Sequence, residues 1–200
     1  MAFTKPDSQK RHLVLDLETF AIAPNATITE IGIVDILSDD RFSVLINPDE
    51  MLTSPAFSHS QQTIEWHLKR DPNYVVTLGH CGLRPDAAAG RLHNWLKEKK
   101  IQTGQDLTIW CQGIDFDIPI ITNFLQHYGY PLEWKYNDVR DIRTLAAFFP
   151  NVDYKKGDHS ALEDSFMAAQ YLRKLAHGWP EVRTMLGLNR LDGAFNYDKV

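Results

Sequence analysis

Residues 12–17 read HLVLDL, and Glu18 follows directly, so that a short apolar stretch ends with two carboxylates. A short apolar run bounded by polar residues is typical of a buried β-strand. Two further strand-like stretches follow closely, ITEIGIVDIL at 28–37 and RFSVLIN at 41–47. The connections between the three stretches are too short for a crossover helix, which favours antiparallel neighbours. This part of the chain therefore predicts a three-stranded meander rather than the start of a Rossmann fold.

The remainder of the chain alternates between helical and strand patterns. We expect a fourth strand at 107–111, a short fifth strand around 139–142, and helices at 63–70, 85–100, 116–128, 144–149 and 160–177. A short helix is expected around 180–186, and no element is assigned to 48–62. Three strands followed by alternating helices and strands predict an α/β protein with a ribonuclease-H-like mixed five-stranded sheet flanked by helices.

The length of 200 residues and the hydrophobic content of 44% fit one domain with a substantial core. We expect a flexible N-terminus at 1–11, the functional domain at 12–178, and a C-terminal extension at 179–200 that packs on the domain or trails it. No apolar run approaches the length of a membrane span, and residues 1–11 lack the apolar core of a signal peptide. The two cysteines, Cys81 and Cys111, form no CxxC motif, which favours a cytoplasmic location.

The net charge of −5 is informative about partners. Proteins that hold nucleic acid by bulk electrostatics are usually basic, so this charge argues against a passive coat on nucleic acid. It argues less against an enzyme, because a carboxylate metal site concentrates negative charge that bound cations reverse.

Asp16 and Glu18 are two residues apart at the end of a predicted strand, where residues i and i+2 lie on the same face. Both carboxylates can therefore reach one metal site at the edge of a sheet. The alternative is a solvated strand end. Burying a charge without a partner is costly, and the apolar surroundings therefore favour the metal site.

Asp115 and Asp117 stand near the start of the predicted helix at 116–128. Two helical positions turn a side chain by roughly 200°, so only one of the two carboxylates can face the site. Asp115 suits the N-cap, and Asp117 suits the metal. Alternatively, both are acidic residues that interact with the helix macrodipole.

Ser160 and Glu163 match a capping box, which predicts Ser160 as the N-cap of the last long helix. Asp164 then lies near the start of this helix, and His159 lies on the loop before it. A ligand on a helix beside a base on a loop suits a site where the base acts on water. The alternative for His159 is an exposed loop histidine. The four carboxylates are hard ligands that suit two Mg²⁺ or Mn²⁺ ions, which can clamp a phosphodiester during hydrolysis.

These motifs resemble a known family. Asp16-x-Glu18, Phe116-Asp117 and His159-x-Ala161-x-x-Asp164 resemble the exonuclease motifs of the DEDDh family, which includes ribonuclease T, oligoribonuclease and proofreading exonucleases. Thr63-Ile64-Glu65-Trp66 and Arg140-Asp141-Ile142-Arg143-Thr144 resemble one branch more closely, that of the exonuclease A of T-even phages and related bacterial 3′–5′ exoribonucleases. The resemblance extends from about His12 to Ala176.

The resemblance implies a role for each matching residue. It implies that His159 is the general base and that Thr19 and Phe20 lie against the 3′-terminal nucleotide. Many family members have Asn where this chain has Gly113, so that contact to the substrate is either absent or supplied by Gln112. Relatives are often dimers, which makes a homodimer possible. The implied metal ligands are Asp16, Glu18, Asp117 and Asp164.

Other residues have two interpretations. Trp66 and His67 are candidates to stack on a base of the substrate, and packing in the core is the alternative for Trp66. Arg140 and Arg143 contact phosphate or, as we favour, form an internal salt bridge beside the fifth strand. The spacing of the remaining ligand-type side chains matches no familiar zinc pattern, which argues against a zinc site formed by His80, Cys81, His93 and Cys111.

The expected function is that of a two-metal-dependent 3′–5′ exonuclease acting on single-stranded DNA or RNA, or 3′ overhangs, with a free 3′ end. It would release nucleoside 5′-monophosphates, with DNA slightly favoured. The alternatives are an exoribonuclease of the same mechanism and a non-catalytic nucleic-acid-binding domain on the same fold. All five catalytic positions are filled, which argues against the non-catalytic domain.

Overall fold

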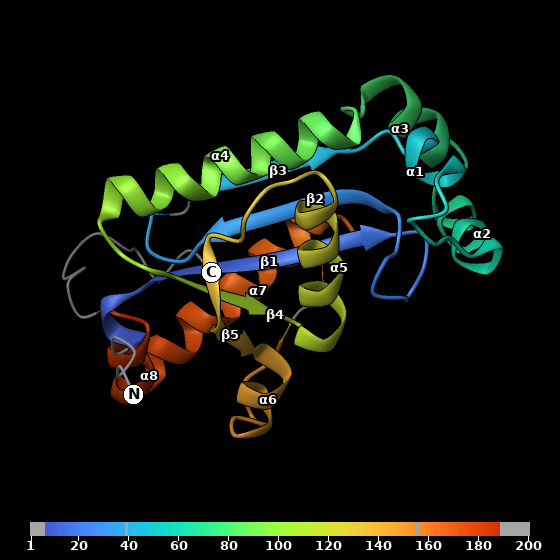
Figure 1. Cartoon of the computed structure of the whole chain (residues 1–200). Coiled ribbons are helices and arrows are strands. Elements are labelled where there is room, and N and C mark those ends of the chain that lie inside the picture. Colours follow the sequence, from blue (N-terminus) through green and yellow to red (C-terminus); the bar gives the residue numbers. More distant parts are fainter. Residues whose placement is uncertain (1–6, 39, 155–156, 189–200) are drawn as a thin grey trace.

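The computed structural model describes residues 7–38, 40–154 and 157–188. These residues contain one five-stranded sheet with the strand order β3-β2-β1-β4-β5 (Figure 1). The antiparallel meander consists of β1 (Arg11–Thr19), β2 (Ile28–Asp35) and β3 (Arg41–Leu45). Strands β4 (Leu107–Cys111) and β5 (Trp134–Asp141) continue the sheet in parallel with β1. The predicted ribonuclease-H-like mixed sheet is confirmed.

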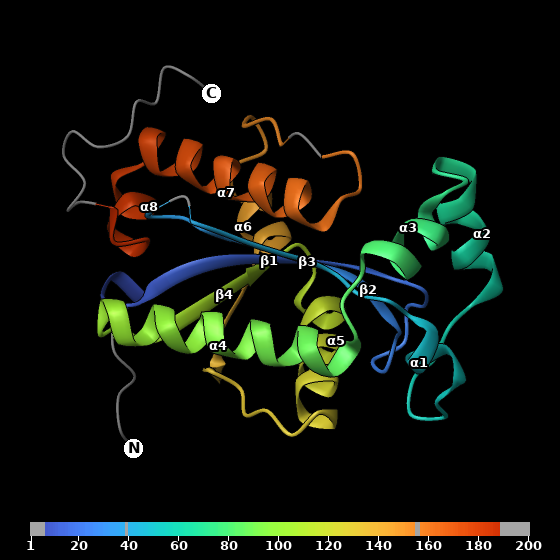
Figure 2. The same ribbon diagram turned by 90° about the horizontal axis from the view of Figure 1, so that it is seen from above.

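Helices cover both faces of the sheet. Helix α4 (Pro85–Thr103) and helix α5 (Ile114–His127) lie on one face, and α7 (Ala161–Gly178) lies on the other (Figure 2). Two hydrophobic cores result, one between the sheet and α4–α5 and one between the sheet and α7. Side chains along β1 alternate between them: Leu13 packs in the α4–α5 core, and Val14 packs in the α7 core. The short helices α6 (Ile142–Ala147) and α8 (Pro180–Met185) border the α7 core.

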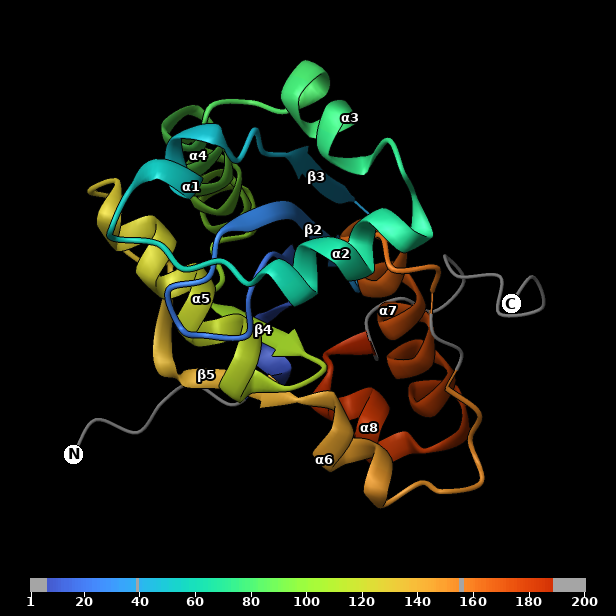
Figure 3. The same cartoon turned by 90° about the vertical axis from the view of Figure 1, so that its right-hand side faces the viewer.

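Three helices fill the stretch between β3 and α4. They are α1 (Asp49–Thr53), α2 (Gln61–Arg70) and α3 (Tyr74–Cys81). Strand β1 points towards α2, which lies across the end of the sheet between α5 and α7 (Figure 3). The sequence predicted only the second of these helices. The first has five residues, too few to show a helical period, and the third carries apolar residues that also suit a strand.

The start of α7 packs against β2 at Gly32. A Cβ atom on residue 32 would overlap the backbone of Ala161, so that only glycine permits this approach. The close contact places the first turns of α7 against the meander. This packing brings the acidic end of α7 to the end of β1.

The predicted flexible N-terminus is too long. Asp7–Gln9 forms a 3₁₀-helix, and the buried ammonium group of Lys10 lies 2.6 Å from Asp138. Asp7 also binds Arg140 at 2.7 Å. Because these ion pairs compensate the buried charge, residues 7–11 are held on the domain. The rest of the predicted segment, 1–6, lies outside the described residues.

The described part of the predicted C-terminal extension packs on the domain. Val182, Leu186 and Leu188 are buried in the core under α7. Residues 189–200 lie outside the described residues. None of the described helices is both long and apolar enough to cross a lipid bilayer.

Candidate active site

The first two carboxylates stand where β1 reaches the end of the sheet. Asp16 and Glu18 alternate with Leu15 and Leu17, whose side chains fill the α4–α5 core. The period of two therefore directs both carboxylates away from that core. The side chain of Glu18 is buried, and the backbone of Glu18 is opposite Glu30 on β2.

The third carboxylate comes from α5. Asp117 is 3% exposed and accepts a hydrogen bond from the backbone of Leu17 on β1. The predicted N-cap is wrong: α5 begins at Ile114 with Gly113 as its N-cap, so Asp115 already lies inside the helix. Gly113 has φ +122°, a conformation that L-residues with side chains rarely adopt.

The fourth carboxylate, Asp164, lies in the first turns of α7, and Ser160 is the N-cap residue as predicted. The capping box is wrong, however, because Ser160 makes no side-chain bond to its own helix. Its hydroxyl donates to Glu30 at 3.0 Å, and the backbone N–H of Leu162 donates to the same carboxylate oxygen at 3.4 Å. A residue of β2 thus provides the cap.

The sequence interpretation did not identify Glu30. Its position offered a signal, since it is an acidic residue inside the apolar stretch 28–37, as Asp16 is inside 12–17. Such a residue needs a partner when it is buried. The partner is the start of α7, which is 130 residues away in the chain.

His159 lies on the loop before α7. A ring nitrogen of His159 and carboxylate oxygens of Glu18 and Asp164 all lie within 4.8 Å of one another. The imidazole also contacts the indole of Trp66 edge-on, with ring centroids 5.1 Å apart. A residue that looks like an ordinary loop histidine in the sequence is therefore brought directly to the carboxylates.

A cleft of about 260 Å³ contains these groups. Its lining residues come from the end of β1, from α2 and α5, from the start of α7 and from the adjoining loops. Figure 3 shows how these helices are arranged around the end of the sheet. Eight of the predicted site residues line it: Asp16, Glu18, Thr19, Trp66, Gln112, Asp117, His159 and Asp164.

The structure places Phe20 elsewhere. Its side chain is fully buried and packs edge-on against His67 and Tyr74, so it does not line the cleft. The contact predicted between the Phe20 side chain and a nucleotide is therefore corrected. Phe20 follows the last residue of β1 and enters the interior under α2, where it supports the cleft from behind.

The other predicted contact residues are held by neighbours. The hydroxyl of Thr19 donates to the carbonyl of Ala21 at 2.7 Å. The side chain of Gln112 accepts a hydrogen bond from the hydroxyl of Tyr154 at 3.2 Å. Trp66 is 42% exposed, which excludes the interpretation that it packs fully in the core.

Seven further residues line the cleft, among them Ile22, His67 and Arg143. Ile22 is 85% exposed, so it presents an apolar side chain at the cleft. His67, the second candidate for base stacking, is only 2% exposed: it donates from Nε2 to the carbonyl of Thr19 at 3.0 Å and stacks on Tyr74. Arg143 is exposed and also lines the cleft, and a Cβ on Gly113 would lie 3.0 Å from its guanidinium group.

Burial and mutual repulsion dominate the electrostatics of the carboxylates. Burial raises the pKa of Asp16 well above its usual range, and the charges of Asp117 and Asp164 raise it further. Burial, reinforced by Glu30, raises the pKa of Glu18 to about 8. Burial raises the pKa of Asp117 to about 7 against the opposing charge of Arg143. Like-charged groups held this closely favour a bound cation.

The two predicted arginines have different roles. Arg140 forms the expected internal salt bridge, and its partner is Asp7. Asp141 instead caps α6 by accepting a hydrogen bond from the backbone of Arg143 at 3.0 Å. The candidate zinc residues form no cluster within the described ranges, where only Glu18, His159 and Asp164 meet the geometric requirement for a metal site.

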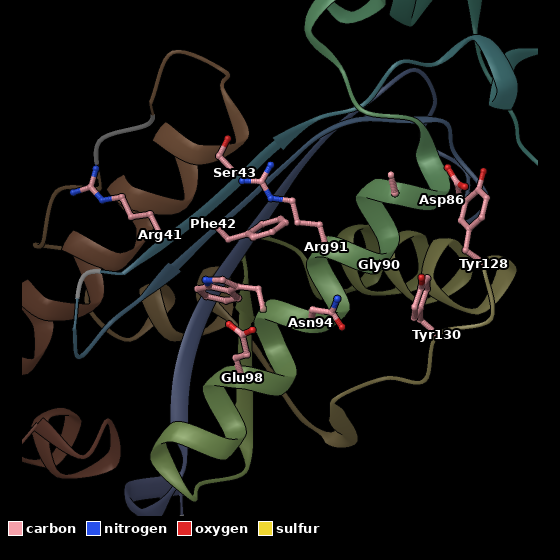
Figure 4. A pocket seen from close by; sticks show the side chains of 12 residues that line it. Arg41, Phe42, Ser43, Asp86, Gly90, Arg91, Asn94, Glu98, Tyr128 and Tyr130 are labelled. Atoms are coloured by element: carbon pink, nitrogen blue, oxygen red, sulfur yellow. The ribbon is translucent and has the colours of Figure 1, made fainter.

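A larger hollow of the described structure lies away from these carboxylates. It has a volume of about 720 Å³ and lies along α4, with Arg91, Asn94 and Glu98 on the helix and Tyr128 and Tyr130 beside it (Figure 4). None of the predicted site residues lines this hollow. Its size alone assigns no chemistry to it, so the smaller cleft remains the candidate active site.

The fold and the grouping of Asp16, Glu18, Asp117, Asp164 and His159 are those of the DEDDh class of 3′–5′ exonuclease domains. A family model provides the more specific assignment. The model of the 3′–5′ exoribonuclease Rv2179c-like domain matches residues 11–176. The chain therefore belongs to this family. No curated protein matches the chain.

Solved structures share the fold at low sequence identity. A product-bound exonuclease I has a TM-score of 0.62 and 14% identity, and the match covers 87% of this chain and 45% of that chain. Exonuclease I from Methylocaldum szegediense has a TM-score of 0.65 and 12% identity, and the match covers 90% of this chain and 43% of that chain. The nuclease domain of 3′hExo, a DEDDh family member bound to rAMP, has a TM-score of 0.57 and 14% identity, and the match covers 88% of this chain and 95% of that chain. The chain thus spans less than half the length of the exonuclease I chains.

Proposed function

We propose that the protein is a metal-dependent exonuclease that removes nucleoside 5′-monophosphates from the free 3′ end of single-stranded RNA. The observation that carries this proposal is the cleft in which carboxylates from β1, α5 and α7 meet a loop histidine. The description of the family supports RNA as the substrate, in place of the slight preference for DNA expected from the sequence.

The carboxylates are suited to holding two Mg²⁺ or Mn²⁺ ions. Asp16, Glu18, Asp117 and Asp164 offer oxygen donors only, which match hard divalent cations. The raised pKa values of Asp16, Glu18 and Asp117 support the assignment, because these groups ionise together only beside positive charge. When bound, such ions stabilise the charge on the attacking and leaving oxygens of the phosphodiester.

His159 would act as the general base. As neutral imidazole, it would accept a proton from the attacking water at the ring nitrogen that faces Glu18 and Asp164. The same short distances also suit His159 as a metal ligand, which is a different role. Metal binding by a His159 variant separates the two roles, as described in the Discussion.

The cleft would hold one terminal nucleotide. Its volume of about 260 Å³ lies just below the range of roughly 300–1,000 Å³ that is usual for small-molecule sites. The exposed parts of the Trp66 indole and of the Ile22 side chain offer apolar contacts to a base, and contacts of this kind do not depend on sequence. A 3′-phosphate would add negative charge beside Glu18 and would remove the hydroxyl donor, so we expect it to block the reaction.

Matched RNA and DNA oligonucleotides, labelled at the 5′ end, test this function with the purified protein in Mg²⁺ and in Mn²⁺. We expect a ladder that shortens from the 3′ end, faster on RNA, and no ladder on the 3′-phosphorylated strand. The variant D164N controls for a contaminating nuclease. Faster cleavage of DNA would overturn the choice of sugar, and no cleavage of either strand would favour a non-catalytic binding domain.

Two further properties stay predictions. A homodimer would appear as twice the chain mass in light scattering at several protein concentrations. A cytoplasmic location would appear in cell fractionation.

A further inference from the structure

The backbone at His159 adopts an unusual conformation. His159 has φ +63°, and no other non-glycine residue in the described ranges has a positive φ. Residues with a side chain disfavour this region, so contacts from the surrounding structure must hold it. Whatever holds this peptide also places the imidazole beside the carboxylates.

Arg70 makes the contacts that hold this peptide. It lies at the end of α2, and its Nη2 donates to the carbonyl of Asp158 at 2.6 Å and to the carbonyl of His159 at 3.1 Å. The two acceptors lie on consecutive residues, so one nitrogen bridges the turn. A charged donor makes stronger hydrogen bonds than a neutral donor does.

Trp66 links the same two residues from the side. The guanidinium of Arg70 lies 5.0 Å from the centroid of the Trp66 ring, and the imidazole of His159 contacts that indole edge-on. Trp66 and Arg70 are four residues apart, so they share one face of α2. One helical face thus contacts both the backbone and the ring of His159.

The residues on either side of this peptide have contacts that do not involve Arg70. Gly157 packs so closely on Asp164 that a Cβ would overlap the carboxylate. Ser160 donates a hydrogen bond to Glu30 on β2. Loss of Arg70 should therefore release the peptide of 158–159 and leave the carboxylate of Asp164 in place.

We propose that Arg70 is a positioning residue: it bridges the carbonyls of Asp158 and His159, and so holds His159 at the carboxylates in the conformation needed for proton transfer. The inference rests on the proposed role of His159 as general base. Arg70 would therefore act through His159 rather than on the substrate.

A double-mutant cycle tests whether Arg70 acts through His159. We expect R70Q to lower kcat by about ten- to a hundredfold with little change in KM, because a misplaced base slows proton transfer. In the H159A background, R70Q should cause no further loss. R70K should recover part of kcat, since an ammonium also donates to carbonyls, although without the planar geometry of guanidinium. K69Q, which removes an exposed charge from the neighbouring position of α2, should keep the wild-type kcat.

Equal, multiplicative losses in both backgrounds would overturn the inference and indicate that Arg70 contacts the substrate directly. Hydrogen exchange of metal-free protein gives a second readout that does not need activity. The peptide containing His159 should exchange faster in R70Q than in wild type and K69Q, and unchanged exchange would also overturn the inference. If H159A keeps the wild-type kcat, the proposed base is wrong, and the exchange experiment still decides whether Arg70 holds the loop.

Discussion

Gly157 lies directly against the carboxylate of Asp164, and a Cβ atom on residue 157 would overlap Oδ1. The backbone of the loop before α7 therefore packs directly on the carboxylate of Asp164. A side chain at this position must displace either the loop or the carboxylate.

The first prediction follows from this contact. We expect G157A to weaken Mn²⁺ binding by about tenfold or more, as changes around metal ligands commonly do. Isothermal titration of the metal-free protein measures the affinity. G79A is the matched control, because a Cβ there meets no atom within 4 Å and Gly79 lies inside α3. Unchanged Mn²⁺ binding in G157A would contradict the placement of Asp164.

The second prediction concerns the stability of the metal-free protein. Unfolded carboxyl groups lose their protons near pH 4, whereas Asp117 and Glu18 in the folded protein do so only near pH 7 and 8. Between these values the folded state binds more protons, so its free energy of unfolding falls as the pH rises from about 5 to 8. Thermal midpoints in EDTA should show this fall.

Two comparisons control the pH experiment. D117N should make the fall shallower, because it removes one of the titrating groups. Mg²⁺ at pH 8 should raise the midpoint of the wild type, since it binds only the folded site. A midpoint in EDTA that rises steadily to pH 8 would contradict the account of repelling carboxylates. The ion pairs of Asp7 have the opposite effect on the pH dependence of stability. Because they lower the pKa of Asp7, their contribution to the free energy of unfolding is lost only as the pH falls below about 4.

The third prediction concerns Glu30, the cap of α7. E30A removes the acceptor for Ser160 and Leu162 and should cost about 1–2 kcal/mol of unfolding free energy. E30Q keeps an acceptor oxygen for these two donors and also removes a negative charge beside Glu18. It should therefore lower the free energy of unfolding less than E30A does, measured in EDTA at pH 8. Chemical denaturation measures both values. Equal losses in E30A and E30Q would indicate that the charge, and not the cap, matters.

The fourth prediction separates the two possible roles of His159. As a general base, H159A should lower kcat by about 10² to 10⁴ and leave Mn²⁺ affinity nearly unchanged. As a metal ligand, the same change should weaken Mn²⁺ binding strongly. Titration of metal-free H159A with Mn²⁺ decides between the roles, with D164N as the variant expected to lose metal affinity.

The sequence predicted those parts of the fold and site that local patterns encode. The apolar stretches at 12–17 and 28–37 carry the strand signal, and the spacing of Asp16 and Glu18 places both on one face of β1. The grouping of the carboxylates agrees with the resemblance to DEDDh motifs. Each of these features depends on residues close together in the chain.

The remaining features depend on contacts between distant segments. The cap from Glu30 requires the close approach of Gly32 to Ala161, which no local pattern encodes. The capping box at Ser160 was misleading for this reason, because a tertiary acceptor replaced the local one. The bond from Arg70 to the His159 loop likewise arises only when α2 lies across the end of the sheet (Figure 3).

The most direct test of the central claim compares linear and circular single-stranded RNA of the same sequence, each incubated with the protein and Mg²⁺. Our account predicts that the linear strand with a free 3′-hydroxyl is converted to nucleoside 5′-monophosphates, while the circle stays intact. It also predicts that D164N and EDTA each abolish the reaction on the linear strand. Cleavage of the circle as fast as the linear strand would contradict the account, because such an enzyme would need no 3′ end.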